Sequence, residues 1–225
     1  MRDLDLWYTE LGRDLSPNSV RNVHAIVRRV LNRGVAWGWI DRNPALYATL
    51  PEQHSIEVAP PTTAQVKALL EGARENPTLY VAVRLAASTG ARRGQLCSIR
   101  WRDIRGGVLT MEHAIVEGTD GLVEKSRKEG NRISAPLDDG TLAVLEEHRR
   151  ERRALLTAVD GGELPDDAFV LSQAIDGSTP PRPSWITTAW TRLRNRVGFP
   201  DVRFHDLRHY VGTQLMAHYD PVTVA

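Results

Sequence analysis

Cysteine, lysine and long hydrophobic runs are scarce in this sequence. The shortage of cysteine excludes a disulfide-bonded protein, and the shortage of long hydrophobic runs excludes a membrane-spanning one. Cys97 is the single cysteine of 225 residues, so no disulfide can form within the chain, and a reducing compartment is expected. No apolar run is long enough to span a bilayer, and the acidic start, MRDLDLWYTE, is no signal peptide. The sequence therefore predicts a cytosolic protein with no membrane partner.

The shortage of lysine means that positive charge comes almost entirely from arginine. Only Lys67, Lys125 and Lys128 are lysines among the 29 basic residues, and the net charge is +1. A guanidinium is a planar fork that matches phosphate oxygens. A codon bias toward arginine explains this composition equally well, so composition alone does not require a nucleic-acid partner.

A proline-rich stretch at residues 51–62, PEQHSIEVAPPT, predicts a linker. Before it, one long helix is expected, with Ser16 as N-cap, Pro17 at the first position and an end at Asn43-Pro44. Its expected core stripe consists of Val20, Val23, Val27, Val30, Leu31 and Val35. Its other side is either a solvated face or a DNA-binding face, and it carries Arg21, Arg28, Arg29 and Asn32.

The part after the linker predicts helices around one small antiparallel sheet. The expected helices cover residues 62–75, 78–99 with a break at Gly90, 138–159, 186–198 and 205–219. Short strands are expected between residues 106 and 137, with a turn at 119–121 and a tight hairpin at Glu129-Gly130-Asn131. Pairs such as Glu146 with Arg150 indicate a solvent-exposed helix face. The predicted fold class is mainly α with a small antiparallel β-sheet, α+β.

Several residues of types that can act in sites have a simpler structural interpretation. Cys97 is expected to be a small buried filler, Asp103 to cap or turn the chain into the sheet, and Tyr210 to lie in the core. The six tryptophans are expected to pack in cores or between helices rather than to stack on bases; they are Trp7, Trp37, Trp39, Trp101, Trp185 and Trp190.

Two stretches in the middle of the chain could bind an anion. In STGARRGQL, residues 88–96, a Thr-Gly turn precedes a helix start that would present Arg92 or Arg93 together with exposed amides. An ordinary surface helix boundary has the same pattern. In KSRKEGNR, residues 125–132, a hairpin could carry Lys128 into a site built elsewhere, or the lysine could simply blunt an edge strand.

The third candidate stretch is HDLRHY, residues 205–210. On a helix, His205, Arg208 and His209 share one face. The His-x-x-x-His spacing suits a zinc pair, which suggests a zinc-dependent hydrolase as an alternative function. Against zinc, Asp206 stands where a glutamate is usual, and Arg208 places a cation between the two histidines. His218 is the only downstream candidate for a third ligand.

In this order, the three stretches resemble the tyrosine recombinase (phage integrase) family. The first family box is matched by Thr89, Gly90, Arg92, Gly94, Leu96, Trp101 and Asp103. Lys128 stands where similar chains place a hairpin lysine, and the last box is matched by His205, Leu207, Arg208 and His209. The resemblance implies a partial helical core-binding domain at 1–50, a linker at 51–62 and an integrase-like catalytic domain at 63–225 that lacks its C-terminal segment.

The resemblance also implies a function, namely site-specific DNA recombination or integration. Arg92 and Arg208 would clamp the scissile phosphate of double-stranded DNA, Lys128 would be the general acid, and His205 would contact the phosphate. A tyrosine would form a 3′-phosphotyrosyl bond, so no metal, ATP or other cofactor is expected. Such recombinases act as four protomers on DNA. The implied setting is the cytoplasm of a bacterial or phage-infected cell, in association with the nucleoid.

The sequence departs from the family pattern in two places. Gln95 stands where the family usually has a glutamate. The Gly-His segment and the nucleophilic tyrosine that follow the last box in related chains are absent, and neither Tyr210 nor Tyr219 is expected to replace that tyrosine. We therefore expect a C-terminally truncated recombinase that is inactive alone and forms no covalent DNA adduct. A non-catalytic DNA-binding module of the same fold is the alternative.

Overall fold

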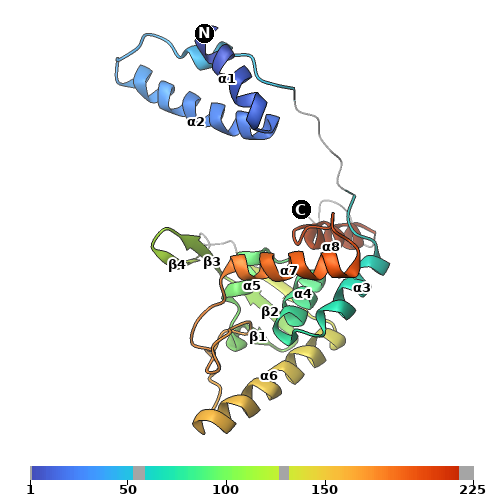
Figure 1. Ribbon diagram of the computed structural model, residues 1–225. Helices are drawn as coiled ribbons and strands as arrows, with labels where there is room; N and C mark the ends of the chain where they lie inside the picture. The colour runs from blue at the N-terminus through green and yellow to red at the C-terminus, as the bar shows by residue number, and fades with distance from the viewer. Residues whose placement is uncertain (1, 53–58, 127–131, 218–225) are drawn as a thin grey trace. The chain divides into compact units, whose positions relative to one another are not determined.

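The structure is a computed structural model that describes residues 2–52, 59–126 and 132–217 (Figure 1). The chain forms two compact units, Met1–Val58 and Ala59–Ala225. The smaller unit contains helices α1 (Arg2–Asp14) and α2 (Pro17–Ala36) and the 3-10 helix η1 (Pro44–Tyr47).

Local capping explains where α2 begins and ends. Ser16 is the N-cap as predicted, because its hydroxyl accepts a hydrogen bond from the Ser19 amide at 3.2 Å. The predicted end at Asn43 is wrong, since α2 stops at Ala36 and Gly38 turns the chain with a φ of +72°. Asn43 instead caps η1, where its Oδ1 accepts from the Ala45 amide at 2.8 Å.

Exposed apolar side chains in α2 and just after it correct two further predictions. Val30, expected in the core stripe, is 64% exposed. Trp37 and Trp39 are 54% and 73% exposed, although their rings lie together with centroids 4.6 Å apart, so the packing prediction is wrong for them. It is confirmed for Trp101 and Trp190, which are buried. The apolar arc of α2 is wider than the face that α1 and η1 cover, which leaves one flank in solvent.

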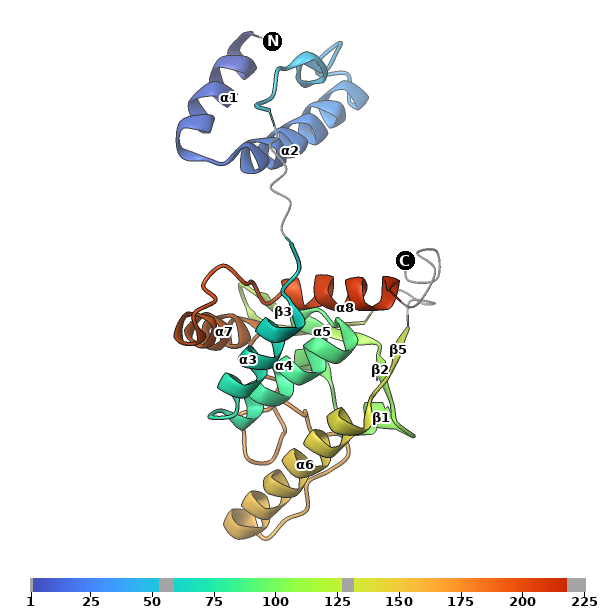
Figure 2. The ribbon, with the colours of Figure 1, turned by 90° about the vertical axis from the view of Figure 1, so that its right-hand side faces the viewer.

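The larger unit is built around one buried helix. Its elements are α3 (Thr63–Ala73), α4 (Pro77–Thr89), α5 (Arg93–Ser98), η2 (Trp101–Asp103), β1 (Ile104–Arg105), β2 (Val108–Met111), β3 (His113–Gly118), β4 (Gly121–Ser126), β5 (Ile133–Pro136), α6 (Asp139–Asp160), α7 (Pro183–Val197) and α8 (Asp206–Met216). Helices α3, α6, α7 and α8 all pack against α4 (Figure 2). The apolar side chains of α4 form the centre of the core.

Within the described residues, the strands form two small antiparallel sheets, β1-β2-β5 and β3-β4, rather than the single sheet expected. The helix-rich architecture with short antiparallel strands confirms the predicted α+β class. The turn predicted near Thr119 joins β3 to β4, whereas the predicted hairpin at residues 129–131 lies outside the described residues. In the described part of the chain, no helix combines the length and the apolar composition needed to cross a membrane.

On the charged face of α6, one ion pair differs from the pair that sequence spacing predicted. The expected pair of Glu146 with Arg150 is wrong, because Arg150 forms its ion pair with Glu147. Both partners are largely exposed, which agrees with the predicted solvent-facing side. Such a pair contributes little to stability.

Candidate functional site

The first candidate stretch forms a tight turn between α4 and α5. The Thr89 hydroxyl donates to the Leu85 carbonyl at 2.6 Å, and Gly90 ends α4 with a φ of +64°. A Cβ atom at position 90 would lie 3.6 Å from Cγ of Arg208 and 3.5 Å from Cβ of Val211. These are ordinary contact distances, so the turn lies directly against α8, and it is the left-handed conformation rather than space that favours glycine here.

Gln95 fixes the backbone of this turn where it enters α5. Its side chain is 3% exposed, and its Oε1 accepts a hydrogen bond from the Arg92 amide at 2.9 Å. Its Nε2 is buried and has no hydrogen-bond partner within the described residues. The glutamine thus holds the backbone at Arg92 and places no carboxylate beside that side chain.

The two arginines of this turn have different surroundings. Arg93 donates to the Thr187 hydroxyl on α7, so it links α5 to that helix. Both arginines are exposed, but because Arg93 is engaged with Thr187, Arg92 is the better placed of the two to reach a ligand in solvent. Residue type alone does not separate the two arginines, whereas the family resemblance assigns Arg92; the contact of Arg93 with Thr187 joins residues 94 positions apart and has no local signal in the sequence.

The last candidate stretch opens α8, with His205 as its N-cap residue. Asp206 is 2% exposed, accepts from the Arg203 amide at 2.8 Å and pairs with the Arg203 guanidinium at 2.8 Å. Its carboxylate therefore stabilises the start of α8 and binds Arg203. Arg208 is half-buried, and its Nη1 donates to the Gly90 carbonyl at 2.8 Å. This hydrogen bond joins the two arginine-containing stretches, which lie 118 residues apart.

Charged residues of both stretches affect the pKa of His205. Partial burial lowers its pKa below the ordinary value, and the charges of His209, Arg208 and Arg92 lower that pKa further, while Asp206 opposes them. The charges of Arg92 and Arg208 thus both act on His205, and Arg208 also binds the turn that precedes Arg92. Because the nearby carboxylate of Asp206 is engaged with Arg203, the cluster is positive and suited to an anion.

The zinc interpretation of His205 and His209 finds no support. Their rings meet edge to face, with centroids 5.3 Å apart and an angle of 89°. Within residues 2–52, 59–126 and 132–217, no group of three or more potential ligands is arranged to hold a metal ion. His218 lies outside the described residues.

Other predicted site residues have mixed surroundings. Lys128 lies outside the described residues. Of the predicted DNA-binding face on α2, Arg28 and Arg29 are exposed. Arg21 donates to the Pro51 carbonyl at 2.9 Å, and Asn32 accepts from Asn43 at 2.6 Å. Only part of that face is therefore open to a ligand without first breaking contacts inside the unit.

The structural interpretations of three residues are confirmed. Asp103 Oδ2 accepts from the Arg100 amide at 2.8 Å and turns the chain into β1. Cys97 is fully buried, and burial raises the pKa of its thiol to about 12. Tyr210 packs against the core, with its hydroxyl oxygen 3.4 Å from that of Thr63.

Comparisons with known proteins identify the family of the chain. The model of the phage integrase family matches residues 62–225. The chain is 23% identical over 231 residues to a XerC-like tyrosine recombinase of Caldanaerobacter subterraneus, covering 92% of this chain and 57% of that protein. It is 25% identical over 233 residues to the integrase of Mycobacterium phage D29, covering 96% of this chain and 56% of that one. The chain therefore spans little more than half the length of these two relatives.

Solved structures show the same fold. A lambda integrase dimer bound to a COC′ core site matches with a TM-score of 0.72 and 17% identity, over 99% of this chain and 76% of that one. The Tn1549 transposon integrase in complex with a circular intermediate DNA matches with a TM-score of 0.83 and 16% identity, over 99% and 75% of the two chains. With the family match over residues 62–225, we conclude that this chain belongs to the phage integrase family.

Proposed function

We propose that this chain is the DNA-binding and phosphate-clamping part of a site-specific tyrosine recombinase, and that strand cleavage is the activity of the whole protein. The observation that carries the proposal is the cluster of Arg92, His205 and Arg208, linked by the hydrogen bond from Arg208 to the Gly90 carbonyl. Double-stranded DNA is the proposed partner, and further protomers join on it. The relatives come from a bacterium and a phage, so the proposed place of action is a bacterial nucleoid or a phage genome.

The proposed chemistry follows from the charge on the scissile phosphate. As a nucleophile attacks, negative charge grows on the non-bridging oxygens, and guanidinium groups of Arg92 and Arg208 stabilise it. His205, whose pKa is lowered by partial burial and by nearby positive charges, hydrogen-bonds the phosphate. Loss of one arginine should cost on the order of 2–4 kcal/mol of transition-state stabilisation, by analogy with removal of an oxyanion-hole donor.

Proton transfer completes the proposed step. The tyrosine hydroxyl gives its proton to the His205 imidazole, and its oxygen forms a bond to phosphorus. The bond from phosphorus to the 5′-oxygen breaks, and Lys128 gives its proton to that leaving oxygen. The product is a 3′-phosphotyrosyl bond that a second DNA 5′-hydroxyl can reverse. No residue in the described part of the chain is assigned as the nucleophile.

A binding measurement tests the phosphate clamp. Duplexes selected from a random pool by binding to the chain are labelled, and affinity is measured by fluorescence anisotropy at several salt concentrations. Each phosphate contact that is lost should reduce the salt slope by about one. We expect this reduction for Arg92→Gln and for Arg208→Gln. The control, Arg74→Gln, removes an exposed arginine that pairs with Glu71 on α3, and it should leave the slope unchanged.

A cleavage measurement separates a recombinase from a non-catalytic DNA-binding module. We define the extended chain as this chain continued with the C-terminal segment of the XerC-like recombinase, which by resemblance carries the tyrosine. On a nicked duplex the extended chain should form a covalent 3′ adduct, and Arg92→Ala should reduce its formation at least about a hundredfold. Tight DNA binding without any adduct from the extended chain would instead favour the non-catalytic module.

A further inference from the structure

Two side chains hold the turn between α4 and α5, one from each side. The Thr89 hydroxyl accepts a hydrogen bond from the Ala91 amide at 3.2 Å, and Gln95 Oε1 accepts one from the Arg92 amide at 2.9 Å. Two consecutive peptide groups are therefore fixed by side chains, and the second of them belongs to Arg92. The backbone from which the Arg92 side chain departs is thus tied to α5 through Gln95.

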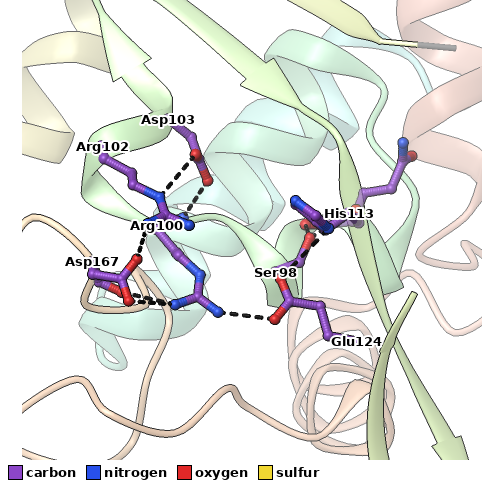
Figure 3. Close-up of polar contacts among 8 residues, drawn as sticks. Ser98, Arg100, Arg102, Asp103, His113, Glu124 and Asp167 are labelled. Atoms are coloured by element: carbon purple, nitrogen blue, oxygen red, sulfur yellow. Dashed lines mark hydrogen bonds and ion pairs between the residues drawn. The ribbon is translucent and has the colours of Figure 1, made fainter. Parts of the chain in front are cut away.

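Gln95 is itself held by the contact of α5 with β3. It is 3% exposed. The Ser98 hydroxyl oxygen lies 2.8 Å from the carbonyl oxygen of Gln95 and 2.8 Å from that of His113 on β3 (Figure 3). A Cβ atom at position 94 would lie 2.6 Å from the Ile115 carbonyl oxygen, so helix and strand are in direct contact. Close packing thus sets where the amide oxygen of Gln95 lies.

The β3-β4 hairpin that contacts α5 is attached to the rest of the unit through Arg100 (Figure 3). Arg100 Nη2 lies 2.9 Å from the Glu124 carboxylate on β4, and Nη1 lies 2.8 Å from the Asp167 carboxylate. The guanidinium carbon sits 4.1 Å from the centre of the Phe169 ring, and only 16% of the Arg100 side chain is exposed. Helix α5 therefore packs on a hairpin that is itself fixed.

Gln95 uses only one of the two polar atoms of its amide. Oε1 binds the Arg92 amide, whereas Nε2 is buried and has no hydrogen-bond partner within the described part of the chain. A buried donor without an acceptor is unfavourable, and an apolar side chain of similar length would avoid that cost. Stability alone therefore gives little reason for a glutamine at this position. What distinguishes it from an apolar residue is the oxygen bound to the Arg92 amide.

The same turn serves both arginines of the cluster. The Gly90 carbonyl accepts from Arg208 Nη1 at 2.8 Å, and Arg92 follows two residues later. A guanidinium binds phosphate oxygens through a rigid fork, so a small displacement of the backbone removes one of its two hydrogen bonds. The conformation of this turn therefore decides whether the two guanidinium groups can share one phosphate.

We propose that Gln95 is a positioning residue, whose amide oxygen holds the Arg92 backbone so that the Arg92 side chain meets the same DNA phosphate as Arg208. This inference rests on the proposed function. Gln95 is buried, and it makes no contact with DNA of its own. A purely structural role would lower stability, whereas a positioning role lowers phosphate binding, and does so only while Arg92 is present to be positioned.

The test is a double-mutant cycle in the 225-residue chain, with DNA affinity measured by anisotropy at several salt concentrations and Tm by calorimetry. Gln95→Met keeps the length of the side chain and removes both its acceptor and its unpaired donor. Gln95→Glu keeps an acceptor oxygen. The matched control is Gln65→Met, because Gln65 Oε1 accepts from the Thr62 amide at 2.8 Å in the same capping arrangement, on a helix that carries none of the cluster residues.

If the inference holds, Gln95→Met weakens DNA binding about tenfold and reduces the salt slope by about one, as Arg92→Gln does. Its Tm stays within about 2 °C of the parent, because the lost acceptor and the removed unpaired donor offset each other. The double variant of Arg92→Gln with Gln95→Met binds no more weakly than Arg92→Gln alone. Gln95→Glu restores affinity to within about threefold of the parent, and Gln65→Met binds as the parent does.

The outcomes separate the inference from the function on which it rests. If Arg92→Gln leaves the salt slope unchanged, the proposed phosphate clamp is overturned, whatever Gln95→Met does. If Arg92→Gln weakens binding but Gln95→Met does not, or if the two losses add in the double variant, the positioning role is overturned. Gln95→Leu, which is smaller and also lacks an acceptor, passes through the same cycle, so that a misfit of methionine does not decide the result.

Discussion

Replacing Gly94 by alanine tests how closely α5 must approach β3. A Cβ atom at position 94 would lie 2.6 Å from the carbonyl oxygen of Ile115, and ordinary contact begins near 3.4 Å, so strand or helix must move by roughly 0.8 Å. The obstacle is backbone within a paired strand, which cannot rotate away. Overpacking of this kind costs about 1–3 kcal/mol, and the gain in helix propensity returns at most about 1 kcal/mol.

We therefore expect Gly94→Ala to lower the free energy of unfolding of the larger unit by about 1–2 kcal/mol, which corresponds to roughly 3–6 °C in Tm. Differential scanning calorimetry measures the shift. The matched control is Gly212→Ala in α8, where nothing lies within 4 Å of the new Cβ, so that variant should be slightly more stable than the parent. If Gly94→Ala gains stability as Gly212→Ala does, the close approach is not real and the positioning of Arg92 beside it loses its basis.

Three further predictions concern other parts of the molecule. Burial raises the pKa of Cys97 to about 12, so a thiol reagent at pH 8 should label the unfolded chain and leave the native one unlabelled; rapid native labelling would contradict this. Burial lowers the pKa of His148 below 6.5, so its stabilising contribution is complete above that pH and is lost as the pH falls; urea unfolding between pH 7 and 5 should show a decline that His148→Gln reduces. Ser16→Ala should destabilise α2 by about 1 kcal/mol, seen as lost helicity on heating, and no loss would mean that Ser16 is not an effective cap.

Local signals in the sequence predicted most helix boundaries correctly. Thr62 caps α3 in a reciprocal pair with Gln65, and Gly90 ends α4, because these effects depend on neighbouring residues only. The predicted end of α2 was wrong because Asn43-Pro44 is the stronger helix-stop signal in the sequence. The chain in fact leaves the helix earlier, where Gly38 turns it with a positive φ. The exposed flank with Val30 could not be predicted, since periodicity shows which residues are apolar but not which of them find a neighbour.

The family resemblance named the residues of the candidate site, but the sequence did not predict the contacts between them. The resemblance to the phage integrase family named Arg92, His205 and Arg208, and in the structure Arg208 binds the Gly90 carbonyl while Arg92 and Arg208 lower the pKa of His205. The carbonyl of Gly90 as an acceptor for Arg208 has no sequence signature, because every residue carries a carbonyl. The contact between Arg21 and Pro51 was invisible for the same reason, and it removed one arginine from the expected DNA-binding face.

The measurement that tests the central claim most directly is a crystal structure of this chain bound to a selected DNA duplex. The account predicts one backbone phosphate within hydrogen-bonding distance of the guanidinium groups of Arg92 and Arg208 and of the His205 imidazole. Duplex bound through another surface of the larger unit, or the two arginines on separate phosphates, would contradict it.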